Sequence, residues 1–479
     1  MDWLEHYKSI RENAILHSLS NLRDKTVYGK ILSSYVEDTA NGYIYLQVSL
    51  RTKEMVEWDY AYFVTLKRKE KDIDDWAQIN EIRHLYKPYF FEFIAPVKRK
   101  DFKKYIPKVD EKWFKVTLYD ENEFDCPKNE KRNKLNTDGL VLSGNAIFSA
   151  SPIITKLKYL SVDFQTKIEQ QERINELEIV LNDLVKGNIS NEKKGLIYQK
   201  LEKCIDSCGV VDYHIYNVGQ GNFIQMDYHN NGQILFDVGF TMFNKPEKRF
   251  IRDNIKIFNE LKPDIIILSH WDIDHILGLS YMENSLNNGD DIAWVAPVIS
   301  NKFNEVSQSA KLLLAYLLRS ERDVYLVNTI DSKTDDDRLV FNLSDSFQIW
   351  QGNGKNGRFN KNNNIGLIVK INDPAGKILF PGDCEYSHMP DACMDEYEYM
   401  VASHHGAKQD FDRIDIKSTS QDAVCICSVG KNKYGHPTVE ARQWLRKQGF
   451  HIVCTDEVKE CIISKDKCGG YTFECVVPE

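Results

Sequence analysis

Buried strands alternate with amphipathic helices after residue 208. Continuous apolar runs that predict strands lie at 233–237, 264–270, 366–371, 377–383 and 423–430. Helical patterns lie between them, at 311–319 and 438–448. Gly- and Asp-rich turns separate the runs, and polar residues stand at the strand ends. Such a pattern indicates a layered α/β fold with a site at the strand ends.

The first 160 residues follow a different pattern. Short alternating runs at 43–49 and 60–66 predict strands, because side chains of a half-buried strand alternate between its two faces. Met1 to Leu19 predicts a capping helix. This part is therefore predicted to be a small α+β or β-rich module.

A helical stripe separates these two parts. Its apolar members at three- and four-residue steps are Ile174, Leu177, Leu181 and Leu184. Gly187 supplies a stop, so residues 164–187 predict a helix that packs on its own domain. A dimerising or partner-binding helix is the alternative. The predicted organisation is an N-terminal module at 1–160, a helical linker at 161–208 and an α/β domain at 209–479.

Length, composition and charge restrict the class of protein. The chain has 479 residues, of which 42% are apolar and 28% charged, values typical of a soluble globular protein with two or three domains. A net charge of −9 argues against a protein that coats nucleic acid over its whole surface. It leaves a nuclease open, because metal ions and local Lys/Arg clusters supply positive charge.

Cysteine usage and the N-terminus bear on the compartment. The 11 cysteines are an odd number, and neither close pair, Cys204/Cys208 or Cys425/Cys427, has zinc-finger spacing with a second pair behind it. The charged N-terminus lacks the apolar core of a signal peptide, and no apolar run is long enough to span a bilayer. We therefore expect free thiols, a cytoplasmic location and no membrane contact.

The strongest chemical feature follows the predicted strand at 264–270. Four residues that commonly bind metals stand within six positions: His270, Asp272, Asp274 and His275. Alternation along an extended loop points the first three to one side, and His275 can turn toward a second ion. Two ions about 3.5–4 Å apart can hold a bridging hydroxide.

This loop resembles the metal motif His-x-His-x-Asp-His of the metallo-β-lactamase superfamily, with Asp272 at the second His position. The variant is similar to the soluble hydrolase domain of the ComEC family of DNA-uptake channel proteins. Further segments between about 210 and 470 resemble that family's motifs in the same order: Val218-Gly-Gln-Gly-Asn, Leu235-Phe-Asp-Val-Gly, Asn363-Asn, Pro381-Gly-Asp, Ser403-His-His-Gly-Ala-Lys and Ser428 to His436.

The resemblance implies a fold and a set of site residues. The fold would be a metallo-β-lactamase αββα four-layer sandwich, with the N-terminal α+β or β-rich domain and the helical linker added to it. Asp383 would bridge the metals and Asp237 would support the metal loop. At least one of His404 and His405 would complete the shell of the second metal. The implied metal ligands are His270, Asp272, Asp274, His275, Asp383, His404 and His405.

Catalytic and substrate-contacting residues are implied in the same way. Asp274 and His436 are the candidates for catalysis, and His436 could bind a phosphate oxygen or protonate a leaving group. Further candidates for metal or substrate contact are Asn363, Asn364, Gln220, Asn222, Lys408, Asn432 and Tyr434.

Several positions depart from the family pattern. No His occurs between His275 and His388, so the third-motif His is absent, and an Asn stands in its place. Fewer nitrogen and more oxygen ligands move the preference for the two divalent ions from zinc toward manganese, with magnesium as a further alternative. Asn222 replaces an Asp and Ala407 replaces a Ser of the ComEC pattern, which concerns substrate handling more than metal binding.

Together these features predict a metal-dependent phosphodiester hydrolase, a nuclease acting on DNA through a dinuclear site. A small-molecule phosphodiesterase of the choline-phosphate ester or cyclic-nucleotide type is one alternative, and a non-enzymatic metal-binding scaffold for a partner is another. The stretch 98–108 interleaves basic and aromatic residues, a mixture that can bind nucleic acid, although a solvated basic loop is the simpler interpretation. A protein partner could bind through the N-terminal module or the 164–187 helix.

Overall fold

A computed structural model gives the fold as two compact units, Met1–Gly187 with Ser300–Ser320, and Asn188–Ile299 with Glu321–Glu479. The structure describes residues 8–9, 27–32, 37–38, 43–69, 86, 88–98, 113–120, 140–143, 145–148, 157–163, 170–186, 191–205, 211–228, 232–241, 248–282, 291–299, 306–320, 322–329, 334–354, 361–374, 376–430, 435–465 and 470–477. The predicted N-terminal helix, apart from residues 8 and 9, and the basic stretch after Lys98 lie outside these residues. The predicted boundaries near 160 and 208 stay predictions.

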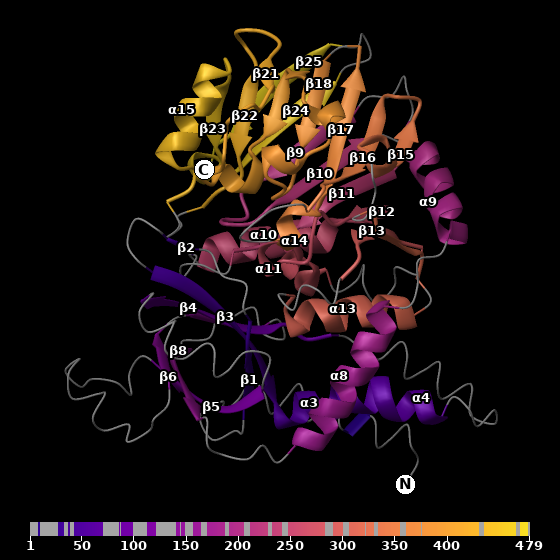
Figure 1. The fold of residues 1–479 in the computed structure, drawn as a ribbon, viewed down its shortest axis with the longest axis vertical. Helices are drawn as coiled ribbons and strands as arrows, with labels where there is room; N and C mark the ends of the chain where they lie inside the picture. Colours follow the sequence, from indigo (N-terminus) through magenta and orange to yellow (C-terminus); the bar gives the residue numbers. More distant parts are fainter. Residues whose placement is uncertain are drawn as a thin grey trace. The chain divides into compact units, whose positions relative to one another are not determined.

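The first unit is built on an antiparallel sheet, in the order β6-β8-β5-β1-β3-β4-β7 with β2 beside β3 (Figure 1). Its strands are β1 Val27–Ile31, β2 Glu37–Asp38, β3 Tyr43–Thr52, β4 Phe91–Lys98, β5 Trp113–Asp120, β6 Leu140–Ser143, β7 Asn145–Phe148 and β8 Leu157–Asp163. The strand predicted at 43–49 is confirmed as part of β3.

The strand predicted at 60–66 is wrong, because this stretch is helical. It runs through α3 Lys53–Tyr60, the π-helical turn η3 Ala61–Thr65 and α4 Leu66–Lys69. Thr52 caps α3 by accepting a hydrogen bond from the Met55 N–H. All of Ala61 to Val64 are buried, so the run is apolar on every side and shows no amphipathic helical spacing.

The predicted 164–187 helix is observed as α8, Gln171–Lys186, in the first unit. Its stripe is buried at Ile174, Leu177 and Leu181, and the helix packs against α3 and α13, Gln308–Arg319. The Lys30 ammonium lies 2.8 Å from the carboxylate of Glu178 on the same helix. The helix therefore packs on its own unit.

In its described residues the second unit contains an eight-stranded sheet and a seven-stranded sheet. One has the order β14-β13-β12-β11-β10-β9-β24-β25, and the other β15-β16-β17-β18-β20-β22-β23. The strands of the first are β9 Val211–Tyr216, β10 Phe223–Tyr228, β11 Gly232–Val238, β12 Ile265–Ile267, β13 Ala293–Pro297, β14 Val324–Val327, β24 Glu460–Lys465 and β25 Tyr471–Val476. Those of the second are β15 Leu339–Leu343, β16 Phe347–Gln351, β17 Leu367–Asp373, β18 Gly376–Phe380, β20 Tyr399–Val401, β22 Val424–Cys427 and β23 His451–Cys454.

Helices and short elements complete this unit. The helices are α9 Asn191–Cys204, α10 Lys248–Glu260, α11 Ile273–Ile276, α14 Lys361–Asn364 and α15 Val439–Lys447. The 3₁₀ turns are η7 Leu277–Tyr281, η8 Asp336–Arg338, η9 Tyr386–His388, η10 Asp391–Cys393, η11 Ser403–Gly406 and η12 Thr455–Glu457, and β19 Glu396–Tyr397 pairs with β21 Lys417–Ser418.

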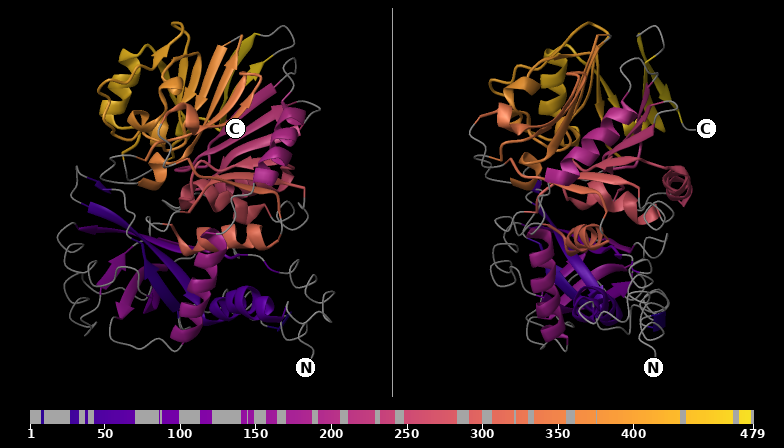
Figure 2. Two further views of the ribbon diagram at one scale, coloured as in Figure 1. Left: turned by 45° about the vertical axis from the view of Figure 1, so that its right-hand side comes forward. Right: turned by 90° about the vertical axis from the view of Figure 1, so that its right-hand side faces the viewer.

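Four layers are stacked in the second unit. The inner faces of the two sheets share one apolar core, in which Ile224 and Met226 of β10 meet Phe380 of β18. On the outer face of the first sheet, Phe258 of α10 contacts Phe223 with ring centroids 5.2 Å apart. Trp444 of α15 packs on the outer face of the second sheet, so the two helices flank the sheets from opposite sides (Figure 2). The predicted αββα sandwich with an added N-terminal domain is confirmed.

This arrangement brings several loops to one end of the sandwich. Because β18, β20 and β22 are parallel, the loops that follow them leave from one edge of their sheet. The loops after β11 and β12 leave from the same edge of the other sheet. In the part of the chain that the structure describes, no helix has the length and apolar character needed to cross a membrane.

Candidate metal centre

The central loop begins directly after β12, whose three isoleucines are fully buried. Ser269 and His270 follow the end of the strand at Ile267, and α11 starts at Ile273 with Asp272 at its N-cap. His270 and His275 are 1% or less exposed, whereas the Asp272 side chain is 31% exposed. The loop after this buried strand thus places two histidines inside the protein, while the Asp272 carboxylate stays partly exposed.

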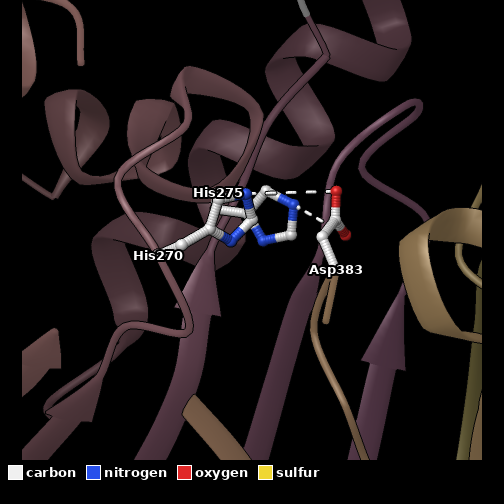
Figure 3. Close-up of side chains that lie close together, drawn as sticks. All are labelled: His270, His275 and Asp383. Carbon is white, nitrogen blue, oxygen red and sulfur yellow. Dashed lines mark ion pairs between the residues drawn. The ribbon is translucent and has the colours of Figure 1, made fainter. Parts of the chain in front are cut away.

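Asp383 lies between the histidines of two loops, one after β12 and one after β20. Its Oδ1 is 3.2 Å from His275 Nε2 and 3.5 Å from His405 Nε2. Its Oδ2 is 3.5 Å from His404 Nε2 and 4.0 Å from His270 Nε2. Figure 3 shows the rings of His270 and His275 facing this carboxylate. Each oxygen of Asp383 therefore faces a different set of imidazoles, as a carboxylate shared by two ions would.

Two groups in the described residues have the donor set of a metal site. The first is His270, His275 and Asp383, with Asp272 Oδ2 3.4 Å from His270 Nε2. The second is Asp274, His275 and His405. Within each group the ligand atoms lie within 4.8 Å of one another, so the two groups are consistent with a dinuclear site.

The imidazole tautomers fit metal binding. His275 Nδ1 lies 2.7 Å from Asp237 Oδ2, and His405 Nδ1 lies 2.7 Å from the Ser428 carbonyl oxygen. Both partners accept hydrogen bonds, so the Nδ1–H groups donate, and in the neutral form of each ring the lone pair is on Nε2. Among the described residues, the buried Nε2 atoms of His270, His275 and His405 have no hydrogen-bond partner, the state expected of metal ligands.

Asp237 supports the loop from behind. Its Oδ1 accepts the Ser269 N–H at 2.7 Å, and its Oδ2 accepts the Ser269 hydroxyl at 2.8 Å and the Asn222 amide at 2.9 Å. Together with His275, four donors converge on one fully buried carboxylate. Asp237 itself has a φ of 58°, a left-handed conformation that Asp tolerates better than most residues.

Burial and the neighbouring charges shift the pKa values in opposite directions. Burial would raise the pKa of Asp383, but His275, His404 and His405 hold it well below its usual range. Burial would lower the pKa of His275, but Asp383 and Asp237 raise it well above the ordinary value. The acids are therefore ionised and ready to bind cations.

The two adjacent histidines have different roles in the geometry. His404 and His405 both have left-handed backbones, with φ of 49° and 55°. His405 belongs to the second group of ligand atoms, next to Asp274 at 3.7 Å. His404 faces the other oxygen of Asp383, and its ring lies 5.9 Å from that of His436. Burial, followed by the charges of His404 and His405, lowers the pKa of His436 to about 3.

Only some of the remaining predicted residues lie at the metal site. Asn363 donates to Asp383 Oδ2 at 3.3 Å and belongs to the site. Asn364 instead accepts the Glu385 N–H at 3.1 Å, which holds the loop after Asp383. Gln220 is buried in the loop after β9. The Lys408 side chain is 64% exposed and pairs with Glu440 at 2.7 Å. Asn432 and Tyr434 lie outside the described residues.

Three contributors were missed by the sequence analysis. Ser269 contacts Asp237, His270 and His275 through one hydroxyl. Ser428 orients His405 through its carbonyl oxygen and donates its hydroxyl to the Gly221 carbonyl. A Cβ at Gly239 would lie 2.1 Å from the Asp274 carbonyl oxygen. Their only signal is their place beside the predicted motifs, because serine and glycine types alone indicate no metal site.

The fold and this donor set define the class of the second unit, a metal-dependent hydrolase with a His/Asp centre for two ions. Residues 216–337 match the family described as the Metallo-beta-lactamase superfamily. No curated protein matches the chain.

Several solved structures are similar to part of the chain. The metal-dependent hydrolase Tm1679 is 11% identical over 51% of this chain and 95% of its own, with a TM-score of 0.31. YhfI from Bacillus subtilis is 11% identical over 55% and 100%, with a TM-score of 0.31. Zn²⁺-bound PqqB from Methylobacterium extorquens is 11% identical over 49% and 85%, with a TM-score of 0.28. At these values the likenesses say nothing about the substrate.

Proposed function

We propose that this protein is a metal-dependent phosphodiester hydrolase, a nuclease that acts on DNA in the manner of the soluble ComEC-type hydrolase domain. The observation that carries the proposal is the position of Asp383, whose Oδ1 faces His275 and His405 and whose Oδ2 faces His270 and His404. A carboxylate in that position suits a pair of ions, and pairs of ions suit in-line displacement at a phosphodiester.

The donor set contains carboxylate and amide oxygens beside the imidazoles, which supports a phosphodiesterase more than a set of imidazoles alone would. The first group has two imidazoles, His270 and His275, and the Asp383 carboxylate. The Asp272 carboxylate lies 3.4 Å from His270 Nε2, and the Asn363 amide donates to Asp383. The Asn363 Oδ1 atom is buried and has no hydrogen-bond partner among the described residues. Oxygen-rich sets favour manganese or magnesium more than imidazole-rich sets do, and zinc also fits.

When bound, the two ions supply Lewis acidity and activate water near neutral pH. The protein's own residues do the rest. His275 and His405 are fixed by Asp237 and Ser428, so little reorganisation is needed at the moment of reaction. His436, beside His404, contacts a phosphate oxygen of the substrate. Asp274 stays ionised beside His405, with which it belongs to the second group of ligand atoms.

Purified protein incubated with single- and double-stranded DNA and Mn²⁺ tests the proposal. We expect cleavage that falls by at least about 100-fold in Asp383→Ala and His404→Ala variants, because loss of a ligand costs more than loss of its support. Asp412→Asn and His451→Ala are matched controls, since both residues are exposed. Both controls should cleave as wild type does.

The substrate panel separates the alternatives. Equal cleavage of DNA by wild type and the Asp383→Ala variant would sink the proposal. Cleavage of bis(p-nitrophenyl) phosphate without cleavage of DNA would indicate a small-molecule phosphodiesterase instead. Metal binding with neither activity would indicate a metal-binding scaffold.

A further inference from the structure

Two cysteines face each other at the edge of the first sheet of the second unit. Cys461 of β24 and Cys475 of β25 are register partners in an antiparallel pair. Their Sγ atoms are 3.8 Å apart, and neither is in a disulfide. β25 ends the strand order of this sheet, with β24 as its neighbour (Figure 1).

The register suits a covalent link between the two residues. Directly opposed residues of antiparallel strands have Cα atoms about 4.5–5.5 Å apart. Disulfides span Cα separations of about 4.4–6.8 Å. Side-chain rotation therefore brings the two sulfur atoms to bonding distance without moving either strand.

The two thiols differ in accessibility. Cys475 is exposed, whereas Cys461 is fully buried, and burial raises the pKa of the Cys461 thiol. Every other described cysteine is buried. An oxidant in solution thus reaches Cys475 first among the described cysteines, and Cys461 is in contact with it from behind.

We propose that Cys475 and Cys461 form an oxidative modification site, in which hydrogen peroxide converts the pair to a cross-strand disulfide. The Cys475 thiol loses its proton, the thiolate attacks one peroxide oxygen, and the O–O bond breaks, so that a sulfenic acid forms and the departing hydroxide takes up that proton as water. The Cys461 sulfur then attacks the Cys475 sulfur, the S–S bond forms, and hydroxide leaves with the proton of Cys461 as a second water. Two thiols and one peroxide give one disulfide and two waters.

The bond would fix the terminal strand of the sheet. β24 is paired along its whole length with β9, from Glu460 opposite Tyr216 to Lys465 opposite Val211. β25 has its described pairing only with β24. A link at Cys461 therefore ties the edge strand to the interior of the sheet and slows its separation.

Peptide mapping of the full chain after peroxide treatment tests this site. Trypsin releases peptide 460–465, which carries Cys461, and peptide 468–479, which carries Cys468 and Cys475. We expect these two peptides to be linked in oxidised wild type, with a mass about 2 Da below their sum, and to separate on reduction. The thiol titre of the unfolded chain should fall by two from 11.

Two serine variants identify the partner. Cys468→Ser should keep the link, and Cys475→Ser should lose it. Hydrogen exchange of the 468–479 peptide should slow at least about tenfold in the oxidised wild type. A link that survives Cys475→Ser, or Cys475 that proceeds to sulfinic acid without any link, would overturn the proposal. Unchanged hydrogen exchange in the linked protein would overturn the fixing of β25.

Discussion

Replacement of Asp237 by Asn removes the charge behind the metal loop and keeps the side-chain shape. Asn also tolerates the φ of 58° at this position, so the backbone adds no strain. In the native protein Oδ1 accepts one donor and Oδ2 accepts three. The Asn side chain must place its NH₂ group where one of these two oxygens was. The NH₂ group then faces the hydrogen-bond donors that this oxygen accepted in the native protein.

The magnitude follows from counting these bonds. If the amide nitrogen faces the Ser269 N–H, one buried charged hydrogen bond is lost and the other three lose the charge of their acceptor. A hydrogen bond to a charged group contributes about 1.5–3 kcal/mol, so we expect Asp237→Asn to lower the unfolding free energy by about 2–4 kcal/mol. The ring of His275 loses its anionic partner, and metal affinity should fall by about 10–100-fold.

Denaturant unfolding of the metal-free chain and chelator competition with Mn²⁺ measure these two effects separately. Asp227→Asn is the matched control, because among the described residues Asp227 Oδ2 has only a long 3.5 Å contact with Gln225. The unfolding free energy of this variant should change by no more than about 0.5 kcal/mol. Wild-type metal affinity in the Asp237→Asn variant would refute the supporting role of this carboxylate.

Three further changes test other parts of the structure. Burial would raise the pKa of Asp395, but hydrogen bonds from two lysines lower it from 3.8 to about 2. This carboxylate therefore stabilises the fold above pH 3.8, and its contribution is lost as the pH falls through about 2. In Asp395→Asn the unfolding free energy should therefore fall less steeply between pH 4 and about pH 2 than in wild type. Gly239→Ala should lower stability by about 1–3 kcal/mol and weaken metal binding, whereas Gly195→Ala in α9, where a Cβ meets nothing within 4 Å, should be neutral or stabilising. Leu181→Ala should cost about 2–5 kcal/mol in denaturant unfolding, and Ile179→Ala, at a side chain 62% exposed, no more than about 0.5 kcal/mol.

Each change has a result that contradicts its reasoning. An unaltered acid limb in Asp395→Asn would show that the lysine pairs do not stabilise the folded state. Equal effects of the two glycine variants would show that the loop around Asp274 can move aside. Equal effects of the two α8 variants would show that the buried stripe does not hold the first unit together.

The metal loop was predictable because its ligands are contiguous and follow a buried apolar strand. His270 and His275 needed only that strand and its end to be identified. Asp383 follows the buried Ile378, Leu379 and Phe380 of β18, but a Gly-Asp turn alone indicates no metal site, so its role was predicted from the family motif. Local sequence is sufficient where one strand delivers the side chains.

The sequence could not predict which of His404 and His405 lies in the second group of ligand atoms. This placement depends on two successive left-handed residues and on the Ser428 carbonyl, which is distant in sequence. The error at 60–66 has a different origin. A helix that is buried on every side carries no amphipathic period, so its aromatic run looked like a strand.

Metal analysis of the purified chain, reloaded with Mn²⁺ or Zn²⁺ and freed of excess ion, tests the central claim most directly. About two ions per wild-type chain are expected, because Asp383 faces His270 of one ligand group through Oδ2 and His405 of the other through Oδ1. In Asp383→Asn the content should fall to one or fewer, while Asp412→Asn keeps two. Less than one ion per wild-type chain would contradict the claim that this is a dinuclear metal centre.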